Sequence, residues 1–175
     1  MAPAVPRPAD RMDPSPLRPL VAELAASERF RAFADALPAH ARVSEPALPL
    51  VIASLYETLG RLLVCLLPED EHARDAADAV SWYVDAARVA LLPSRGVRWD
   101  SGLEPPAHLV GERARALAVL ESGGLVLASA RALAEGMPPS GARPLPIRLT
   151  HGDELDLDQV VGALALAGYE RVERV

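Results

Sequence analysis

Two short, uniformly apolar runs separated by one amphipathic segment constrain the fold of this chain more than any other feature. The runs are Val89–Leu92 and Leu125–Ala128. They are too short and too continuously apolar for surface helices, so they predict buried strands of a parallel sheet. Between them, residues 107–121 have the apolar spacing of a helix. A strand, a crossover helix and a second strand in this order form the unit from which parallel α/β sheets are built.

Neighbouring segments extend this alternation of strands and helices. The run Leu62–Leu67 predicts a further buried strand that contains the single cysteine, Cys65, and Ala41–Val43 predicts a short strand before it. Between these two, Pro46 begins a predicted helix that Gly60 ends as a C-cap. The expected fold is therefore α/β, with a three-layer arrangement in which helices flank a parallel sheet.

The crossover helix and the segment before the first long helix carry more specific expectations. Within residues 107–121, we expect Val110, Ala114 and Leu117 to face the sheet while Arg113 faces elsewhere. Ser27 is expected to cap a short helix near the beginning of the domain. These expectations rest on helical spacing and on capping chemistry alone.

Proline clusters divide the chain into four predicted segments. Residues 1–16 are rich in proline and predict a disordered tail, whereas 17–136 contain the α/β domain. Residues 137–146 hold four prolines and a glycine and predict a linker. Residues 147–175 contain one expected strand, at 147–150, and one helix that begins near Asp156. Because one strand and one helix cannot close a core, this segment is expected to be the incomplete start of a small α+β domain.

Composition excludes several classes of chemistry. All 18 basic residues are arginines, so the chain has neither a Schiff-base lysine nor the lysine of a phosphate-binding P-loop. One cysteine permits no disulfide within the chain, which favours the cytoplasm. The sequence has no apolar run of about 18 residues, and early prolines argue against a signal peptide. A formal net charge of -6 argues against independent binding to nucleic acid.

The loop after the strand Val89–Leu92 is the first candidate site. It carries Arg95, Arg98, Trp99 and Asp100, and parallel sheets place functional loops at the carboxyl ends of their strands. Trp99 either covers the sheet edge or contacts a partner, and the arginines either bind a phosphate or remain solvated. The phosphate-binding interpretation leads to an alternative function, a nucleotide- or sugar-phosphate-binding α/β enzyme domain with its site around Arg95–Asp100.

Other titratable residues indicate structure more than chemistry. The cluster at residues 69–71 occupies the first turn of a predicted helix, where carboxylates interact favourably with the helix dipole. The acidic residues at 153–158 lack the glycine and the closing glutamate of a calcium-binding loop. The histidines lie on different elements and never at the spacing of a ligand pair. No metal site is expected.

Several motifs, in the order in which they occur, resemble the amino-terminal, UvrB-like module of the bacterial transcription-repair coupling factor (Mfd). They are LPSRGVRWDSGLEPPAHLVGERARAL, LVLASARAL and LTHGDELDLDQVVGALALAGYERVERV, preceded by LPLVIASLYETLGRLLVCLLPEDEHARDAADAV. The resemblance spans most of residues 17–175. It implies an α/β domain similar to the first domain of UvrB, followed by a small domain through which the module recruits the damage-recognition protein UvrA.

The resemblance also implies that this chain does not hydrolyse ATP. Where UvrB-type domains carry a phosphate-binding loop of glycines with a lysine, residues 43–50 read VSEPALPL. A loop without glycine cannot bring backbone N–H groups onto phosphate oxygens, and no ammonium is present to compensate the phosphate charge. We therefore expect a degenerate P-loop, no cofactor and no enzymatic activity in this chain.

The partner-binding residues implied by the resemblance lie in the motif GYERVERV. Arg171 corresponds to an arginine that pairs with acidic groups on UvrA, and an extended backbone places Tyr169 and Glu173 on the same face. In some coupling factors the basic residue lies one place earlier, where this chain has Glu170. Contacts with RNA polymerase and DNA are expected only through other parts of a full-length coupling factor. The predicted function is non-catalytic recruitment of UvrA in transcription-coupled nucleotide excision repair.

Overall fold

A computed structural model of the 175-residue chain describes residues 15–98, 100–137, 139, 147, 149, 151–152 and 154–166. The chain divides into two compact units, Met1–Gly136 and Met137–Val175. Among the described residues, no helix is long and apolar enough to cross a membrane.

The first unit begins with helices α1 (Arg18–Ala26) and α2 (Glu28–Asp35), followed by the 3-10 turn η2 (Glu45–Ala47) and helix α3 (Leu48–Leu59). The Ser27 hydroxyl accepts a hydrogen bond from the backbone N–H of Phe30 at 3.3 Å, so the predicted cap of α2 is confirmed. Gly60 adopts the left-handed conformation, with φ of 58°, and ends α3 as predicted.

The strand predicted at Ala41–Val43 is wrong, because these residues have no strand structure. Ala41 and Val43 instead line an apolar cavity of about 440 Å³ together with Phe30 and Phe33 of α2. Ala41 is exposed and Val43 is half-buried beside these helices, without any pairing to the sheet.

Three parallel strands form the sheet, in the order β1-β3-β2. They are β1 (Leu63–Leu67), β2 (Val89–Leu92), which follows the 3-10 turn η3 (Ala86–Arg88), and β3 (Leu125–Ser129). Both outer strands pair with the same residue of the central strand, since Leu63 and Val89 are each in register with Leu125. The central strand is buried at all five positions, as expected for a strand covered on both faces.

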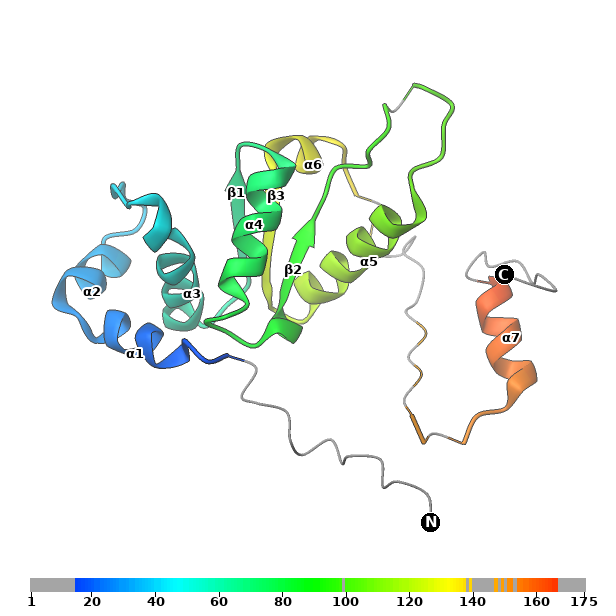
Figure 1. The fold of residues 1–175 in the computed structure, drawn as a ribbon, viewed down its shortest axis with the longest axis horizontal. Helices are drawn as coiled ribbons and strands as arrows, with labels where there is room; N and C mark the ends of the chain where they lie inside the picture. Colours follow the sequence, from blue (N-terminus) through cyan, green and yellow to red (C-terminus); the bar gives the residue numbers. More distant parts are fainter. Residues whose placement is uncertain are drawn as a thin grey trace, which may run out of the picture. The chain divides into compact units, whose positions relative to one another are not determined.

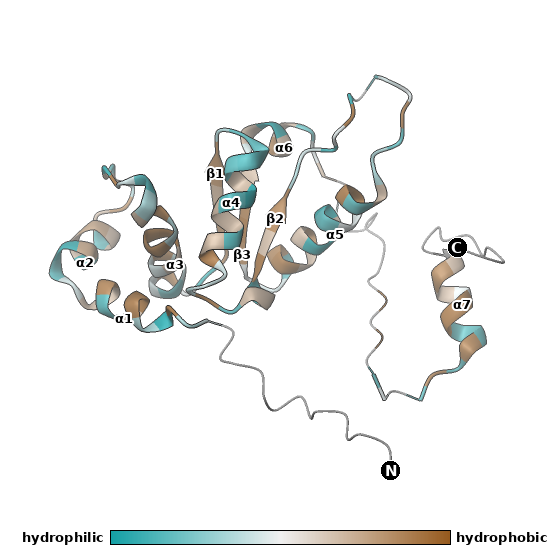
Figure 2. Ribbon diagram, in the orientation of Figure 1, coloured by the Kyte–Doolittle hydropathy of each residue, from teal (hydrophilic) through white to brown (hydrophobic). Residues whose placement is uncertain are grey.

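Helices cover the two faces of the sheet (Figure 1). Leu125 and Leu127 of β3 pack in one core with residues of α3 and of α4 (Asp70–Val80). The alternate residues Val126 and Ala128 pack in a second core with α5 (Ala107–Glu121) and α6 (Ala130–Ala134). Figure 2 shows the strands in the colours of apolar residues, whereas α4 presents hydrophilic turns. The predicted α/β fold with a flanked parallel sheet is confirmed.

The prediction that β1 is fully buried is wrong. Its residues alternate, so that Val64 and Leu66 are 40% and 57% exposed, while Cys65 is half-buried. The reason is helix cover: β1 and β2 both lie at edges of the sheet, but α5 packs against β2 and β3. An apolar run alone does not reveal which strands a helix covers.

The predicted inner face of the crossover helix is also wrong. Val110 is 51% exposed and Ala114 is exposed, whereas Ala116 and Val119 are buried against the sheet. Arg113, which was expected to face elsewhere, has a side chain that is only 13% exposed. The helix is rotated so that this arginine reaches backbone carbonyl groups at the end of the sheet.

In the second unit, the structure describes helix α7 (Leu157–Leu166). The backbone N–H of Asp158 donates a hydrogen bond to Oδ1 of Asp156 at 2.9 Å, which is consistent with the predicted helix start. The strand predicted at 147–150 includes two residues outside the described part of the chain, and it stays a prediction.

Candidate functional site

The carboxyl ends of the three strands bring a set of polar residues together in the first unit. Asp70 lies shortly after β1 and is the first residue of α4, Ser94 follows β2, and Ser129 is the last residue of β3. Parallel sheets bind their ligands at this edge, because loops and helix starts converge there. A functional site is therefore expected at this edge of the sheet.

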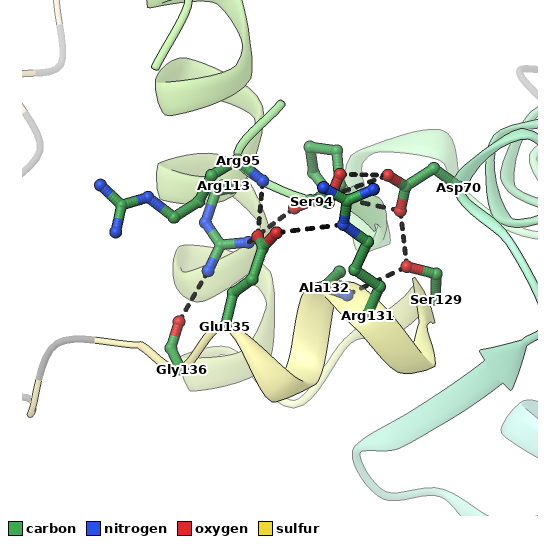
Figure 3. Close-up of polar contacts among 10 residues, drawn as sticks. Asp70, Ser94, Arg95, Arg113, Ser129, Arg131, Ala132, Glu135 and Gly136 are labelled. Carbon is green, nitrogen blue, oxygen red and sulfur yellow. Dashed lines mark hydrogen bonds and ion pairs between the residues drawn. The ribbon is translucent and has the colours of Figure 1, made fainter. Parts of the chain in front are cut away.

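Asp70 accepts hydrogen bonds from the two neighbouring strand ends (Figure 3). Its Oδ1 accepts from the hydroxyl of Ser129 at 2.6 Å and from the backbone N–H of Ser94 at 3.2 Å, while its Oδ2 accepts from the hydroxyl of Ser94. The Ser129 hydroxyl also accepts from the N–H of Ala132 at 3.0 Å and so caps α6. We call Asp70, Ser94 and Ser129 the aspartate clamp.

The electrostatics of the clamp favour the ionised carboxylate. Partial burial by itself would raise the pKa of Asp70, but hydrogen bonds from Ser129 and Ser94, together with the positive charge of Arg131, outweigh it and hold the pKa below its ordinary value. Ser94 and Ser129 are both buried, at 6% and 0% exposure. Their hydroxyl groups therefore depend on Asp70 for a hydrogen-bond acceptor.

A second network joins α5, the loop after β2 and the end of α6. Arg113 donates to the carbonyl oxygens of Pro93 at 2.6 Å and Gly136 at 2.7 Å, and its Nη1 lies 3.7 Å from Oε2 of Glu135. The same carboxylate accepts from the backbone N–H of Arg95 at 2.6 Å, and its Oε1 lies 3.4 Å from Nε of Arg131. Figure 3 shows Glu135 between Arg113 and Arg131. We call this set the Arg113–Glu135 network.

Burial lowers the pKa of Arg113, and the nearby carboxylate of Glu135 opposes that effect. The ordinary pKa of a guanidinium group lies far above neutrality, so Arg113 stays charged. Because its side chain is largely buried, this charge requires a counter-ion. Glu135, whose side chain is 17% exposed, supplies that counter-ion. The pair therefore fixes the loop after β2 to the two helices on the same face.

The predicted loop residues lie in an open cavity beside these networks. The cavity has a volume of about 510 Å³ and is lined by Arg95, Arg98 and Asp100 from the loop and by Arg131 and Glu135 from α6 and its end. Arg98 and Asp100 form an exposed ion pair at 3.2 Å, with side chains 80% and 70% exposed. Trp99, the fourth predicted loop residue, lies outside the described residues. We call this cavity the arginine pocket.

The hydroxyl and carboxylate groups of the clamp are engaged with one another. Both serine hydroxyls donate to Asp70, and the carboxylate oxygens already accept hydrogen bonds from protein groups. The four histidines are all exposed. The part of the chain that the structure describes contains no group of three or more metal-ligating side chains. The clamp therefore holds the strand ends together, and both carboxylate oxygens of Asp70 accept hydrogen bonds from Ser94 or Ser129.

The predicted partner-binding residues Tyr169, Arg171 and Glu173 lie outside the described residues. The segment predicted as a degenerate P-loop, residues 43–50, forms the 3-10 turn η2 and the first turn of α3. No strand precedes it among the residues described between 36 and 44.

Six side chains of the two networks were not predicted from the sequence: Asp70, Ser94, Arg113, Ser129, Arg131 and Glu135. For Asp70 the sequence predicted favourable contact with the helix dipole, whereas the structure shows direct hydrogen bonds across the sheet edge. The signal was present in the sequence, since a small or acidic polar residue follows each of the three apolar runs within three positions. Helical spacing gave no comparable signal for Arg113.

Comparison with known proteins gives two curated relatives. The chain is 35% identical over 135 residues to the transcription-repair-coupling factors of Mycobacterium bovis (strain ATCC BAA-935 / AF2122/97) and Mycobacterium tuberculosis (strain CDC 1551 / Oshkosh). The match covers 72% of this chain and 11% of each relative, so the chain spans about a ninth of their length. No protein-family model matches. The resemblance to coupling factors that the sequence motifs predicted is confirmed.

Proposed function

We propose that this chain is a non-catalytic recruitment module of transcription-coupled nucleotide excision repair that docks onto the damage-recognition protein UvrA. The observation that carries the proposal is the similarity to two transcription-repair-coupling factors over 72% of the chain. The match covers about 11% of the length of those relatives, so we assign to this chain only one of their functions.

The occupied carboxyl edge of the sheet supports a non-catalytic role. In α/β domains this edge receives the ligand, yet here Asp70 fills its centre and accepts hydrogen bonds from Ser94 and Ser129. A carboxylate at the centre of this edge also repels a phosphate group placed directly over it. A nucleotide-hydrolysing domain would bind its substrate at this edge. In this chain, the polar groups at the same edge hold the strand ends together.

The start of α3 supports the absence of a phosphate-binding loop. Pro46 lies in η2 and Pro49 lies in the first turn of α3, and neither has an amide hydrogen to donate. Glu45 adds a negative charge to the same turn. With few free N–H groups and an adjacent carboxylate, this helix start is poorly suited to hold a phosphate.

The docking itself is assigned to Arg171, with Tyr169 and Glu173 beside it, in the motif that resembles the UvrA-binding segment of coupling factors. An arginine suits this task because its planar guanidinium binds a carboxylate through two parallel hydrogen bonds. Such pairs contribute specificity and association rate more than raw affinity. Contacts with RNA polymerase and DNA belong to other parts of a full-length coupling factor.

The test is binding of the complete 175-residue chain to immobilised UvrA, measured by biolayer interferometry at low salt. Arg171→Ala should weaken binding about tenfold or more, because a charge-assisted pair is lost. The matched control is Arg42→Ala, which removes an exposed arginine from the first unit and should bind like the parent. If the parent chain does not bind UvrA, the docking role is wrong. If Arg171→Ala and Arg42→Ala bind equally well, Arg171 is outside the interface.

A further inference from the structure

The arginine pocket lies at the carboxyl edge of the sheet but outside the aspartate clamp. Its walls come from two segments, the loop after β2 and helix α6, which are far apart in the sequence. Nothing in the proposed docking function uses this pocket. Three of its wall residues are arginines: Arg95, Arg98 and Arg131.

Arg131 shares its carboxylate partner, Glu135, with Arg113. Glu135 is the counter-ion of the largely buried Arg113, which does not line the pocket, and its Oε2 also accepts from the backbone N–H of Arg95. Arg131 contacts Oε1 of the same carboxylate through Nε at 3.4 Å, and its side chain is 63% exposed. The i,i+4 spacing of this pair makes it a weak interaction in water. An anion of higher charge can therefore reach the exposed guanidinium of Arg131 and compete with Glu135 for it.

Asp100 and Arg98 form a weak pair as well. Both side chains are more than two-thirds exposed, and an ion pair in that setting contributes little to stability. An incoming anion of higher charge can displace Asp100 at small cost. The wall holds the guanidinium groups of Arg95, Arg98 and Arg131 and the carboxylates of Asp100 and Glu135, and Glu135 also serves Arg113 outside the pocket.

The size of the pocket favours a small organic ligand. Its volume of about 510 Å³ falls within the range of small-molecule sites, about 300–1,000 Å³. Val97 and Ala134 give the wall apolar contact area beside the guanidinium groups. This combination suits a molecule with a charged end and an uncharged body.

The geometry points to the arginine pocket as a binding site for the phosphate group of a small phosphorylated molecule, held by Arg131 and Arg98. A phosphate monoester carries up to two negative charges at neutral pH and offers several acceptor oxygens to planar guanidinium groups. A nucleic-acid strand is disfavoured because the chain has a net charge of -6, and phosphate neutralisation dominates that kind of binding. This inference does not depend on the docking of UvrA.

Isothermal titration calorimetry of the full chain with four probes tests the site and separates the sources of the phosphate group. The probes are inorganic phosphate, ribose 5-phosphate, AMP and adenosine. We expect saturable binding of the phosphorylated organic probes, weaker binding of inorganic phosphate, and no binding of adenosine. Whichever of ribose 5-phosphate and AMP binds with the higher affinity shows whether the pocket prefers a sugar or a nucleoside attached to the phosphate group.

Variants assign the binding to this pocket. Arg131→Gln should weaken the best probe about tenfold, and Arg98→Gln should act in the same direction, because each removes one charge-assisted contact. Both arginines are exposed, so neither substitution should unfold the chain. Arg31→Gln on α2 is the matched control, because it removes an exposed arginine that does not line the pocket and should leave the affinity unchanged.

Three results would overturn the inference. One is the absence of binding by every phosphorylated probe up to about 5 mM, well above the usual range of specific affinities. Another is adenosine binding as tightly as AMP, which would show that the phosphate group contributes nothing. The third is an equal affinity for Arg131→Gln and Arg31→Gln, which would place the bound phosphate elsewhere on the chain.

Discussion

The hydroxyl of Ser129 donates a hydrogen bond to Oδ1 of Asp70 at 2.6 Å, across 59 residues of sequence. This bond joins the end of the central strand to the start of helix α4. The same hydroxyl caps α6 through the N–H of Ala132. One serine therefore fixes the helices that leave two neighbouring strands, and the carboxylate of Asp70 adds Ser94 from the third strand end.

Removal of this carboxylate should destabilise the first unit. Asp70→Ala leaves the buried hydroxyls of Ser94 and Ser129 without their acceptor, and we expect a loss of about 2–3 kcal/mol in the free energy of unfolding. Urea denaturation at pH 7 measures it. The neighbouring Glu69→Ala is the control, because Glu69 is exposed and its side chain makes no capping hydrogen bond. Equal losses in the two variants would mean that the clamp contributes nothing of its own.

The clamp should also make stability depend on pH. Because the folded state holds the pKa of Asp70 below the ordinary value of about 3.9, the unfolded chain takes up this proton first as the pH falls. The stabilisation is therefore complete above the ordinary value and disappears as the pH falls through the lower, folded value. The measurement is the difference in unfolding free energy between the parent and Asp70→Asn from about pH 7 to about pH 2.5. A difference that stays constant or grows on acidification contradicts the assignment.

Burial, more than distance, should decide the effect of breaking the ion pairs. Arg74 lies closer to Glu112, at 3.0 Å, than Arg113 lies to Glu135, at 3.7 Å. Arg113→Met nevertheless should cost about 2–4 kcal/mol, since it removes the largely buried charge that faces Glu135 and leaves the carbonyl oxygens of Pro93 and Gly136 without this donor. Arg74→Met removes a half-exposed pair and should cost at most about 1 kcal/mol. Thermal unfolding of both variants tests this order, and a larger loss in Arg74→Met would reverse it.

Two glycines should respond in opposite ways to alanine. A Cβ at Gly124, just before β3, would lie 2.6 Å from the carbonyl oxygen of Arg88 and would also collide with Val119, so Gly124→Ala should cost about 1–3 kcal/mol. Gly111 lies within α5, and a methyl group there would meet no atom within 4 Å beyond the backbone of its own helix. Gly111→Ala should therefore stabilise by about 0.5–1 kcal/mol through helix propensity. Chemical denaturation compares the two variants, and stabilisation in both would show that Arg88 and Val119 move aside without cost.

The strands were predictable because each is a local run of apolar residues bounded by turns. Val89–Leu92 has the bounds predicted from sequence, and Leu125–Ser129 is longer by one residue. The exposure of Val64 and Leu66 was not predictable, because it depends on α5 packing against β2 and β3 at the other side of the sheet from β1. Likewise, the arginines of the loop after β2 were found from sequence, whereas Arg131 was not, because it reaches the same pocket from a distant helix.

The sequence by itself determined the places of β1, β2 and β3, the start of α2, the end of α3, and the absence of lysine-dependent chemistry in this chain, but it also predicted a strand at Ala41–Val43 that does not form. These properties follow from periodicity, capping and composition, which act over a few neighbouring residues. The tertiary structure alone decided strand order, the rotation of α5, and the partners of Asp70 and Arg113. Each of those depends on groups that are distant in sequence and meet only when the sheet has formed, so no local pattern encodes them.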